Sequence, residues 1–178
     1  MKSKLEMITK KKVCKIVVGG DGAVGKTTLC SRLAGTLEHE REMLMTCGVE
    51  FHDLKVEDGT NNKFEAEIWD LGGQEHFRFM QDTFYEKLDI AIFVYSVEWF
   101  HSFVNIDFWL GFLENRNPLK VYLVANKIDS EDRDVKPEEG NEFARARNME
   151  YFEVSALHGE GFERLKNDII NTIKNQFC

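Results

Sequence analysis

The sequence is poor in cysteine and proline and has no long hydrophobic run. Its four cysteines form no Cys-x-x-Cys pair and have no metal-ligand spacing (Cys14, Cys30, Cys47 and Cys178), which argues against a disulfide framework and predicts reduced, intracellular thiols. No stretch approaches the roughly eighteen apolar residues that a membrane-spanning helix needs. The N-terminus also lacks the apolar segment of a secretory signal. We therefore expect a cytoplasmic protein.

Positive charge is also scarce, because 23 Lys and Arg residues face 31 Asp and Glu residues and the net charge is −8. A nucleic-acid binder needs a basic surface, so we expect no nucleic-acid partner. The one basic stretch is an N-terminal arm, residues 1–12, with five lysines. Contact with anionic lipid and an ordinary solvated terminus both fit this arm. Only two prolines and no low-complexity linker interrupt the rest, which predicts one domain over residues 13–178. A monomer is the default expectation for the oligomeric state.

Short apolar runs alternate with segments of helical periodicity. The second and third runs have alternating apolar residues and are separated by five turn-forming residues, 58–62, so they predict an antiparallel hairpin. The remaining runs predict parallel strands joined by helical crossovers, including one helix over 99–112. The expected fold is a three-layer α/β sandwich with about five helices and six mostly parallel strands, one of them an antiparallel edge strand, at 13–19, 48–57, 63–69, 88–95, 119–125 and 150–155.

A phosphate-binding motif follows the first apolar run. Residues 20–27 read Gly-Asp-Gly-Ala-Val-Gly-Lys-Thr, a complete G-x-x-x-x-G-K-[ST] sequence between a predicted strand and a predicted helix. Glycines let successive backbone N–H groups converge on phosphate oxygens, and the helix directs its positive end to the same point. Lys26 would reach the terminal phosphates, and the Thr27 hydroxyl would bind Mg²⁺.

Polar residues also follow three later strands, where ligands bind in sheets of this kind. Asp70 is suited to holding the water shell of Mg²⁺, and Gly73 to offering its N–H to a terminal phosphate. The Asp129 carboxylate of Asn-Lys-Ile-Asp, residues 126–129, can accept hydrogen bonds from N1–H and the 2-amino group of guanine, an edge that adenine lacks. The loop 155–157, Ser-Ala-Leu, can offer a backbone N–H to the guanine oxygen.

These four motifs, in this order and spacing, resemble those of Ras-superfamily small GTPases over residues 13–176. The stretches 46–51, 74–78 and 84–85 are most similar to Rab proteins, whereas Leu-Gly-Gly-Gln, residues 71–74, is similar to the Arf pattern. The resemblance implies a P-loop NTPase fold of the G-domain type. It further implies a GTP- and GDP-binding switch with slow, Mg²⁺-dependent hydrolysis and a role in trafficking or signalling.

The resemblance also assigns roles to single residues. Thr46 matches the threonine whose hydroxyl reaches Mg²⁺ and whose N–H reaches the γ-phosphate, and Gln74 matches the glutamine that orients the attacking water. Gly22 matches the glycine that leaves room for this glutamine and for a partner's arginine. We therefore expect Gln74 and Lys26 to be catalytic, and Thr27, Thr46 and Asp70, the last through water, to bind the metal. The expected nucleotide contacts are Gly22, Ala23, Val24, Gly25, Lys26, Thr27, Thr28, Thr46, Gly73, Asn126, Lys127, Asp129, Ser155, Ala156 and Leu157.

The family resemblance implies three kinds of protein partner and raises the question of a membrane anchor. An exchange factor, a GTPase-activating protein and effectors are expected to bind through residues 37–51 and 70–85. Cys178 does not fit the C-a-a-X prenylation pattern, so we expect no stable lipid anchor, with transient membrane contact left open.

No aromatic residue between Thr27 and Thr46 is available to cover the guanine ring. Two alternatives follow. The protein holds its nucleotide more loosely than its relatives do, or the guanine ring is covered by Leu37 or by the alkyl stem of Lys127.

Two other functions compete with the switch. A GTP-binding interaction module with little hydrolysis would share every nucleotide contact, although Thr46 and Gln74 argue for hydrolysis. A P-loop kinase or ATPase would share the phosphate motif, but Asn126, Lys127 and Asp129 favour guanine.

Overall fold

The chain folds around one six-stranded sheet in the order β2-β3-β1-β4-β5-β6. The structure is a computed structural model that describes residues 13–37, 46–57, 63–73 and 82–177. All neighbouring strands are parallel except β2, which pairs antiparallel with β3 at one edge. The predicted sheet is thus confirmed, with strands β1 Cys14–Gly19, β2 Val49–Glu57, β3 Lys63–Leu71, β4 Ile90–Ser96, β5 Lys120–Asn126 and β6 Glu150–Val154.

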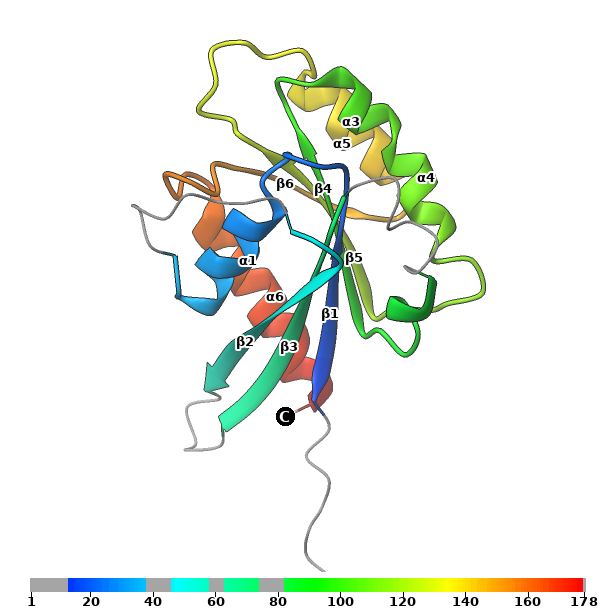
Figure 1. Ribbon diagram of the computed structural model, residues 1–178, viewed down its shortest axis with the longest axis vertical. Helices are drawn as coiled ribbons and strands as arrows, with labels where there is room; N and C mark the ends of the chain where they lie inside the picture. The colour runs from blue at the N-terminus through cyan, green and yellow to red at the C-terminus, as the bar shows by residue number, and fades with distance from the viewer. Residues whose placement is uncertain (1–12, 38–45, 58–62, 74–81, 178) are drawn as a thin grey trace, which may run out of the picture.

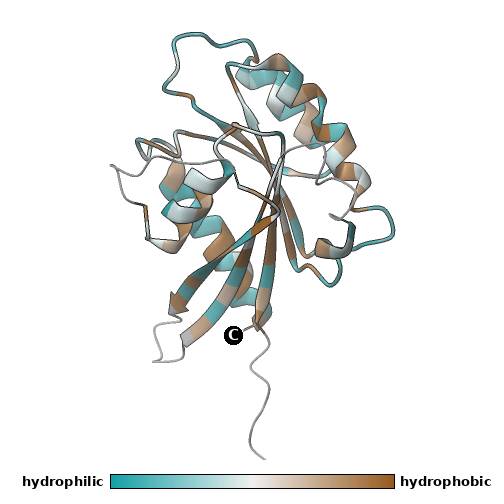
Figure 2. Cartoon of the chain, in the orientation of Figure 1, coloured by the Kyte–Doolittle hydropathy of each residue, from teal (hydrophilic) through white to brown (hydrophobic). Residues whose placement is uncertain are grey.

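The central strands are apolar because both faces of the sheet are covered by helices. Every residue of β4 is buried, as expected for a parallel strand between two helical layers. The edge hairpin alternates instead, with Leu54 and Val56 in the core and Phe51 half exposed. Figure 2 shows apolar residues along the central strands and mixed colours in β2 and β3. The registers place the carboxyl ends of β1, β4, β5 and β6 at the same end of the sheet.

Five helices among the described residues pack on the two faces of the sheet (Figure 1). Helices α1 Lys26–Ala34 and α6 Phe162–Phe177 cover one face through apolar residues such as Leu29 and Ile169. Helices α3 Phe100–Val104, α4 Ile106–Gly111 and α5 Pro137–Ala146 cover the other, where Trp109 is fully buried. None of the helices described here is both long and apolar enough to cross a bilayer.

The single helix expected over 99–112 is wrong, because the structure has α3 and α4 with Asn105 between them. The Asn105 carbonyl accepts a hydrogen bond from the Phe108 N–H at 3.0 Å, which is the tighter i to i+3 spacing. Its side-chain amide donates to the Asp21 carboxylate at 2.6 Å. The turn between the two helices is therefore held against the loop that follows β1.

Candidate nucleotide-binding site

The glycine-rich loop connects β1 to α1 through backbone conformations that favour glycine. Gly20 has φ 141° and Gly25 φ 93°, both in the range that L side chains rarely adopt. A Cβ on Gly25 would lie 2.3 Å from Nδ2 of Asn126, so the loop also packs tightly against the end of β5. The curled loop and the first turn of α1 leave backbone N–H groups directed outward from the end of β1.

Lys26, the first residue of α1, lies beneath this loop. Its side chain is only 6% exposed, and its ammonium donates a hydrogen bond to the Asp21 carbonyl oxygen at 2.6 Å. Burial lowers the pKa of Lys26, while the nearby Asp70 carboxylate opposes that shift. A desolvated cation of this kind gains strongly from an anion at the loop, which suits it to phosphate.

Three oxygen-bearing side chains converge beside Lys26 from three separate elements. The Thr27 hydroxyl lies 2.8 Å from the Thr46 hydroxyl and donates to Oδ2 of Asp70 at 2.5 Å. Thr46, which precedes β2, donates to the same carboxylate oxygen at 3.3 Å. Asp70 is fully buried in β3, and burial raises its pKa. Hydroxyl and carboxylate oxygens are hard ligands, so the three predicted metal residues fit Mg²⁺.

The two glycines after β3 lie directly against the phosphate loop and the start of β2. A Cβ on Gly73 would lie 2.3 Å from the Gly22 nitrogen, and one on Gly72 would lie 2.6 Å from the Thr46 carbonyl oxygen. The Gly72 N–H also donates to the Gly48 carbonyl at 2.8 Å. Side chains are thus excluded at both positions. Gln74 lies outside the described residues, as do 38–45 and 75–81 of the expected partner-binding segments.

Asn126, the last residue of β5, joins two loops of the site. Its amide donates to the Val24 carbonyl at 2.8 Å, and its Oδ1 accepts from the Ala156 N–H at 2.9 Å. The side chain is 2% exposed, so both hydrogen bonds are shielded from water. Asn126 therefore fixes the phosphate loop relative to the loop that follows β6.

Lys127 and Asp129 extend from the loop after β5. Lys127 has φ 66°, and its ammonium binds the Glu98 carboxylate at 2.5 Å, which lowers the pKa of Glu98. The Asp129 side chain is 34% exposed, and His158 Nε2 lies 3.6 Å from it. An open cavity of about 370 Å³ lies beside Lys127 and is also lined by Ala23 and Trp99. Asp129 does not line this cavity, and its own exposure makes its carboxylate accessible to a ligand.

The loop after β6 is held in place from α1. Arg32 donates to the carbonyl oxygens of Ala156 and Leu157, each at 2.5 Å. The Ser155 hydroxyl accepts from the His158 N–H at 3.0 Å. The structure thus brings the described members of the predicted set to the carboxyl end of the sheet, namely Gly22 to Thr28, Thr46, Asp70, Gly73, Asn126, Lys127, Asp129 and Ser155 to Leu157.

Sequence reasoning missed several residues that position this set. The buried Asp21 carboxylate accepts from the Trp109 indole at 3.0 Å and thereby ties the phosphate loop to α4. Arg32 acts across 124 residues of sequence, and Glu98 across 29. Asp21 stands at a variable position of the motif, and no local spacing marks the other two. Only the folded chain reveals them.

Comparisons with known proteins agree with this geometry. The Ras family model matches residues 15–175. Rab-18-B from Danio rerio is 36% identical over 165 residues, covering 89% of this chain and 80% of that protein. Rab-11B from Dictyostelium discoideum is 37% identical over 166 residues, which cover 90% of this chain and 74% of that protein. RABA5a from Arabidopsis thaliana is 35% identical over 169 residues, which cover 91% of this chain and 76% of that protein. The chain therefore belongs to the Ras family of small GTPases and is Rab-like within it.

Proposed function

We propose that this protein binds GTP and GDP together with Mg²⁺, hydrolyses GTP slowly, and acts as a switch whose GTP-bound form recruits effectors. The observation that carries the proposal is the convergence of Thr27, Thr46 and Asp70 next to the buried ammonium of Lys26. The same oxygen and ammonium groups would be adjacent to a polyphosphate seated on the glycine-rich loop.

The phosphate half of the site binds by backbone and charge. The N–H groups of 22–28 donate to the phosphate oxygens, and Lys26 gives its ammonium to the terminal phosphates. Thr27 and Thr46 offer hydroxyl oxygens to Mg²⁺, and Asp70 acts through water. When bound, Mg²⁺ supplies charge neutralisation for the phosphate oxygens.

The guanine half reads a hydrogen-bonding edge. The Asp129 carboxylate accepts from N1–H and the 2-amino group, and adenine would leave that carboxylate unpaired. Asn126 positions the two loops and keeps one amide hydrogen for the base, because its amide donates only one hydrogen bond to a protein atom. The Lys127 side chain lines the cavity, and its ammonium binds the Glu98 carboxylate. The 155–157 loop offers its backbone to the guanine oxygen.

Hydrolysis depends on positioning more than on covalent chemistry. Gln74 orients the attacking water, Gly73 gives its N–H to the terminal phosphate, and Lys26 stabilises the developing negative charge. Gly22 leaves space for Gln74 and for an arginine from a GTPase-activating protein. Such an arginine would accelerate turnover by about 10³ to 10⁵.

The switch would operate through the segments on either side of the metal oxygens. The N–H groups of Thr46 and Gly73 bind the γ-phosphate, which only GTP carries. These two residues lie within the segments 37–51 and 70–85. We propose that exchange factor, activating protein and effectors bind there, and that the protein regulates trafficking from the cytoplasm with transient membrane contact. We further propose that 13–178 acts as one domain and as a monomer, with 1–12 as a basic arm.

A GTP-binding module with little hydrolysis is the second candidate. It is favoured by the tight contact of Gly72 with the backbone of Thr46 and Gly48. We propose that this contact alters where the attacking water is held.

Single-turnover hydrolysis of bound GTP distinguishes these candidates. We expect guanine nucleotide to copurify with the protein and hydrolysis to be slow in the wild type. Gln74→Leu should reduce the rate at least tenfold, while the matched change Gln176→Leu on the exposed end of α6 should not. Bound GTP with no turnover in either protein would favour the binding module, and copurified adenine nucleotide would refute guanine specificity.

A further inference from the structure

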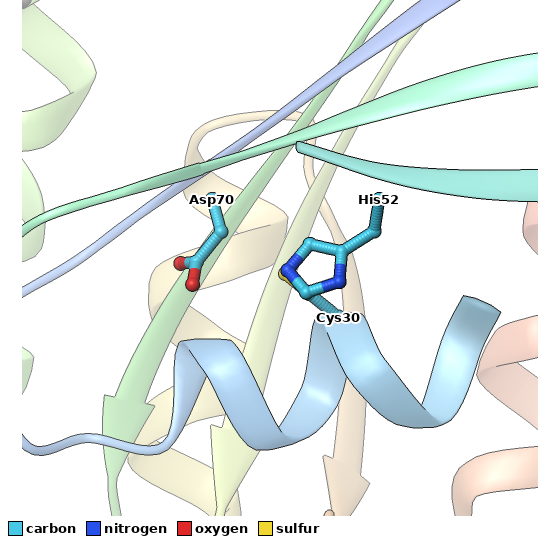
Figure 3. Close-up of side chains that lie close together, drawn as sticks. All are labelled: Cys30, His52 and Asp70. Atoms are coloured by element: carbon cyan, nitrogen blue, oxygen red, sulfur yellow. The ribbon is translucent and has the colours of Figure 1, made fainter. Parts of the chain in front are cut away.

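We propose that Cys30, His52 and Asp70 form a binding site for a thiophilic divalent cation, Zn²⁺ in the first instance. One ligand atom from each residue lies within 4.8 Å of the other two. Figure 3 shows the His52 ring directed toward the Asp70 carboxylate, with the Cys30 sulfur behind the ring. The three residues come from α1, β2 and β3.

Two of these ligand groups are buried without a partner. Among the described residues, Nε2 of His52 and Oδ1 of Asp70 accept or donate no hydrogen bond, although both atoms are shielded from water. Buried polar atoms are normally paired, so each unpaired atom calls for an explanation. A shared cation would satisfy both atoms at once. The observation is independent of the proximity of the three side chains.

The ligand chemistry favours zinc over magnesium. A thiolate, an imidazole and a carboxylate are the donors of zinc sites, whereas Mg²⁺ prefers oxygen alone. Ligand atoms around tetrahedral Zn²⁺ are about 3.3–3.6 Å apart. Side-chain rotations that move the ligand atoms by about 1 Å would therefore bring them to the spacing of a zinc site. The fourth coordination position would be left for water. Binding of a cation to Cys30 releases the thiol proton to solvent, and a thiophilic cation favours that step most.

A cavity lies on the His52 side of the cluster. A cavity of about 530 Å³ opens between the end of α1, β2 and α6, and its lining includes His52, Leu33 and Thr36. Cys30 and Asp70 are themselves fully buried. Of the three residues, His52 alone lines this cavity, and its Nε2 is shielded from water, so a cation that enters from this side must displace the imidazole.

Occupancy of this site would affect the magnesium oxygens, because Asp70 is shared. Its Oδ2 accepts hydrogen bonds from Thr27 and Thr46, whereas its Oδ1 has no hydrogen-bond partner among the described residues. Zinc bound to Asp70 would compete with the magnesium water shell for the negative charge of this carboxylate and weaken nucleotide retention. This regulatory consequence rests on the proposed function, whereas binding of the cation does not.

The test uses Co²⁺ as a spectroscopic probe for Zn²⁺ on the full chain. In a Cys47→Ser/Cys178→Ser background, which leaves the two buried cysteines, we expect a thiolate-to-cobalt charge-transfer band at one equivalent and its displacement by Zn²⁺. Cys30→Ala should abolish the band. Cys14→Ala, the matched change at the other buried cysteine, should preserve it.

His52→Gln provides a second variant in case Cys30→Ala fails to fold, and it should weaken Zn²⁺ affinity at least tenfold. Absence of the band in the parent protein, or a band that survives Cys30→Ala, would overturn the proposal. If the protein hydrolyses GTP but shows no thiolate-to-cobalt band, the zinc site is refuted and the proposed function stands. The band in a protein that binds no guanine nucleotide refutes the proposed function and leaves the zinc site standing.

Discussion

Removing the side chain of Asn126 should destabilise the whole nucleotide-binding end of the sheet. In Asn126→Ala, the Val24 carbonyl and the Ala156 N–H both lose a buried partner, at 2.8 and 2.9 Å respectively. Leaving one such group unsatisfied costs about 1–3 kcal/mol, so the two together should lower the free energy of unfolding by about 2–6 kcal/mol. For a domain of this size that corresponds to a fall in Tm of about 4–24 °C.

Thermal unfolding followed by circular dichroism, with and without saturating GDP, measures this effect. The matched control is Asn141→Ala, since Asn141 is exposed on α5 and its loss should change stability by no more than about 0.5 kcal/mol. Faster GDP release should accompany the lower Tm of Asn126→Ala, because the two loops are no longer joined. A Tm within about 2 °C of wild type would refute the reasoning that these two hydrogen bonds anchor the site.

A pair of helix glycines tests steric exclusion: Gly140→Ala should destabilise by about 1–3 kcal/mol in urea unfolding, because the new Cβ lies 2.5 Å from the Tyr95 hydroxyl. Gly111→Ala meets nothing within 4 Å and should be neutral or stabilising by up to about 1 kcal/mol, so the reverse order would contradict the packing. The hydrogen bond from Lys127 lowers the pKa of Glu98. The contribution of this ion pair to the stability of the fold should therefore be complete above pH 4.5 and be lost as the pH falls further. Glu98→Gln should flatten that acid-side loss of Tm, and an unchanged pH profile would count against the ion pair.

The sheet could be predicted from sequence because its signals are local. Each of the six apolar runs became a strand with bounds within two residues of those expected, and the hairpin followed from alternation on either side of 58–62. The helix over 99–112 could not be predicted in the same way. Its interruption at Asn105 accompanies a hydrogen bond to Asp21, and that contact is set by tertiary structure rather than by the periodicity of the segment.

The candidate site divides along the same line. Most of its residues could be predicted because they belong to contiguous motifs at the ends of strands, whereas Thr46 precedes β2 and was assigned by resemblance to the family. The contacts that hold the motifs together were not, since Arg32 reaches Ala156 over 124 residues and Asn126 reaches Val24 over 102. The grouping of Cys30 with His52 was likewise invisible, because α1 and β2 meet only when the sheet has formed.

Nucleotide competition at the guanine side tests the central claim most directly. A fluorescent GDP analogue bound to wild-type protein with Mg²⁺ is displaced by unlabelled GDP, ADP or xanthosine diphosphate, and the same series is run with Asp129→Asn. We expect GDP to bind more tightly than ADP by about 10⁴-fold or more, because adenine leaves the carboxylate unpaired. Asp129→Asn should lose about 10²-fold or more in GDP affinity and shift its preference toward xanthosine diphosphate. Equal competition by ADP, or an unchanged preference in Asp129→Asn, would contradict the account.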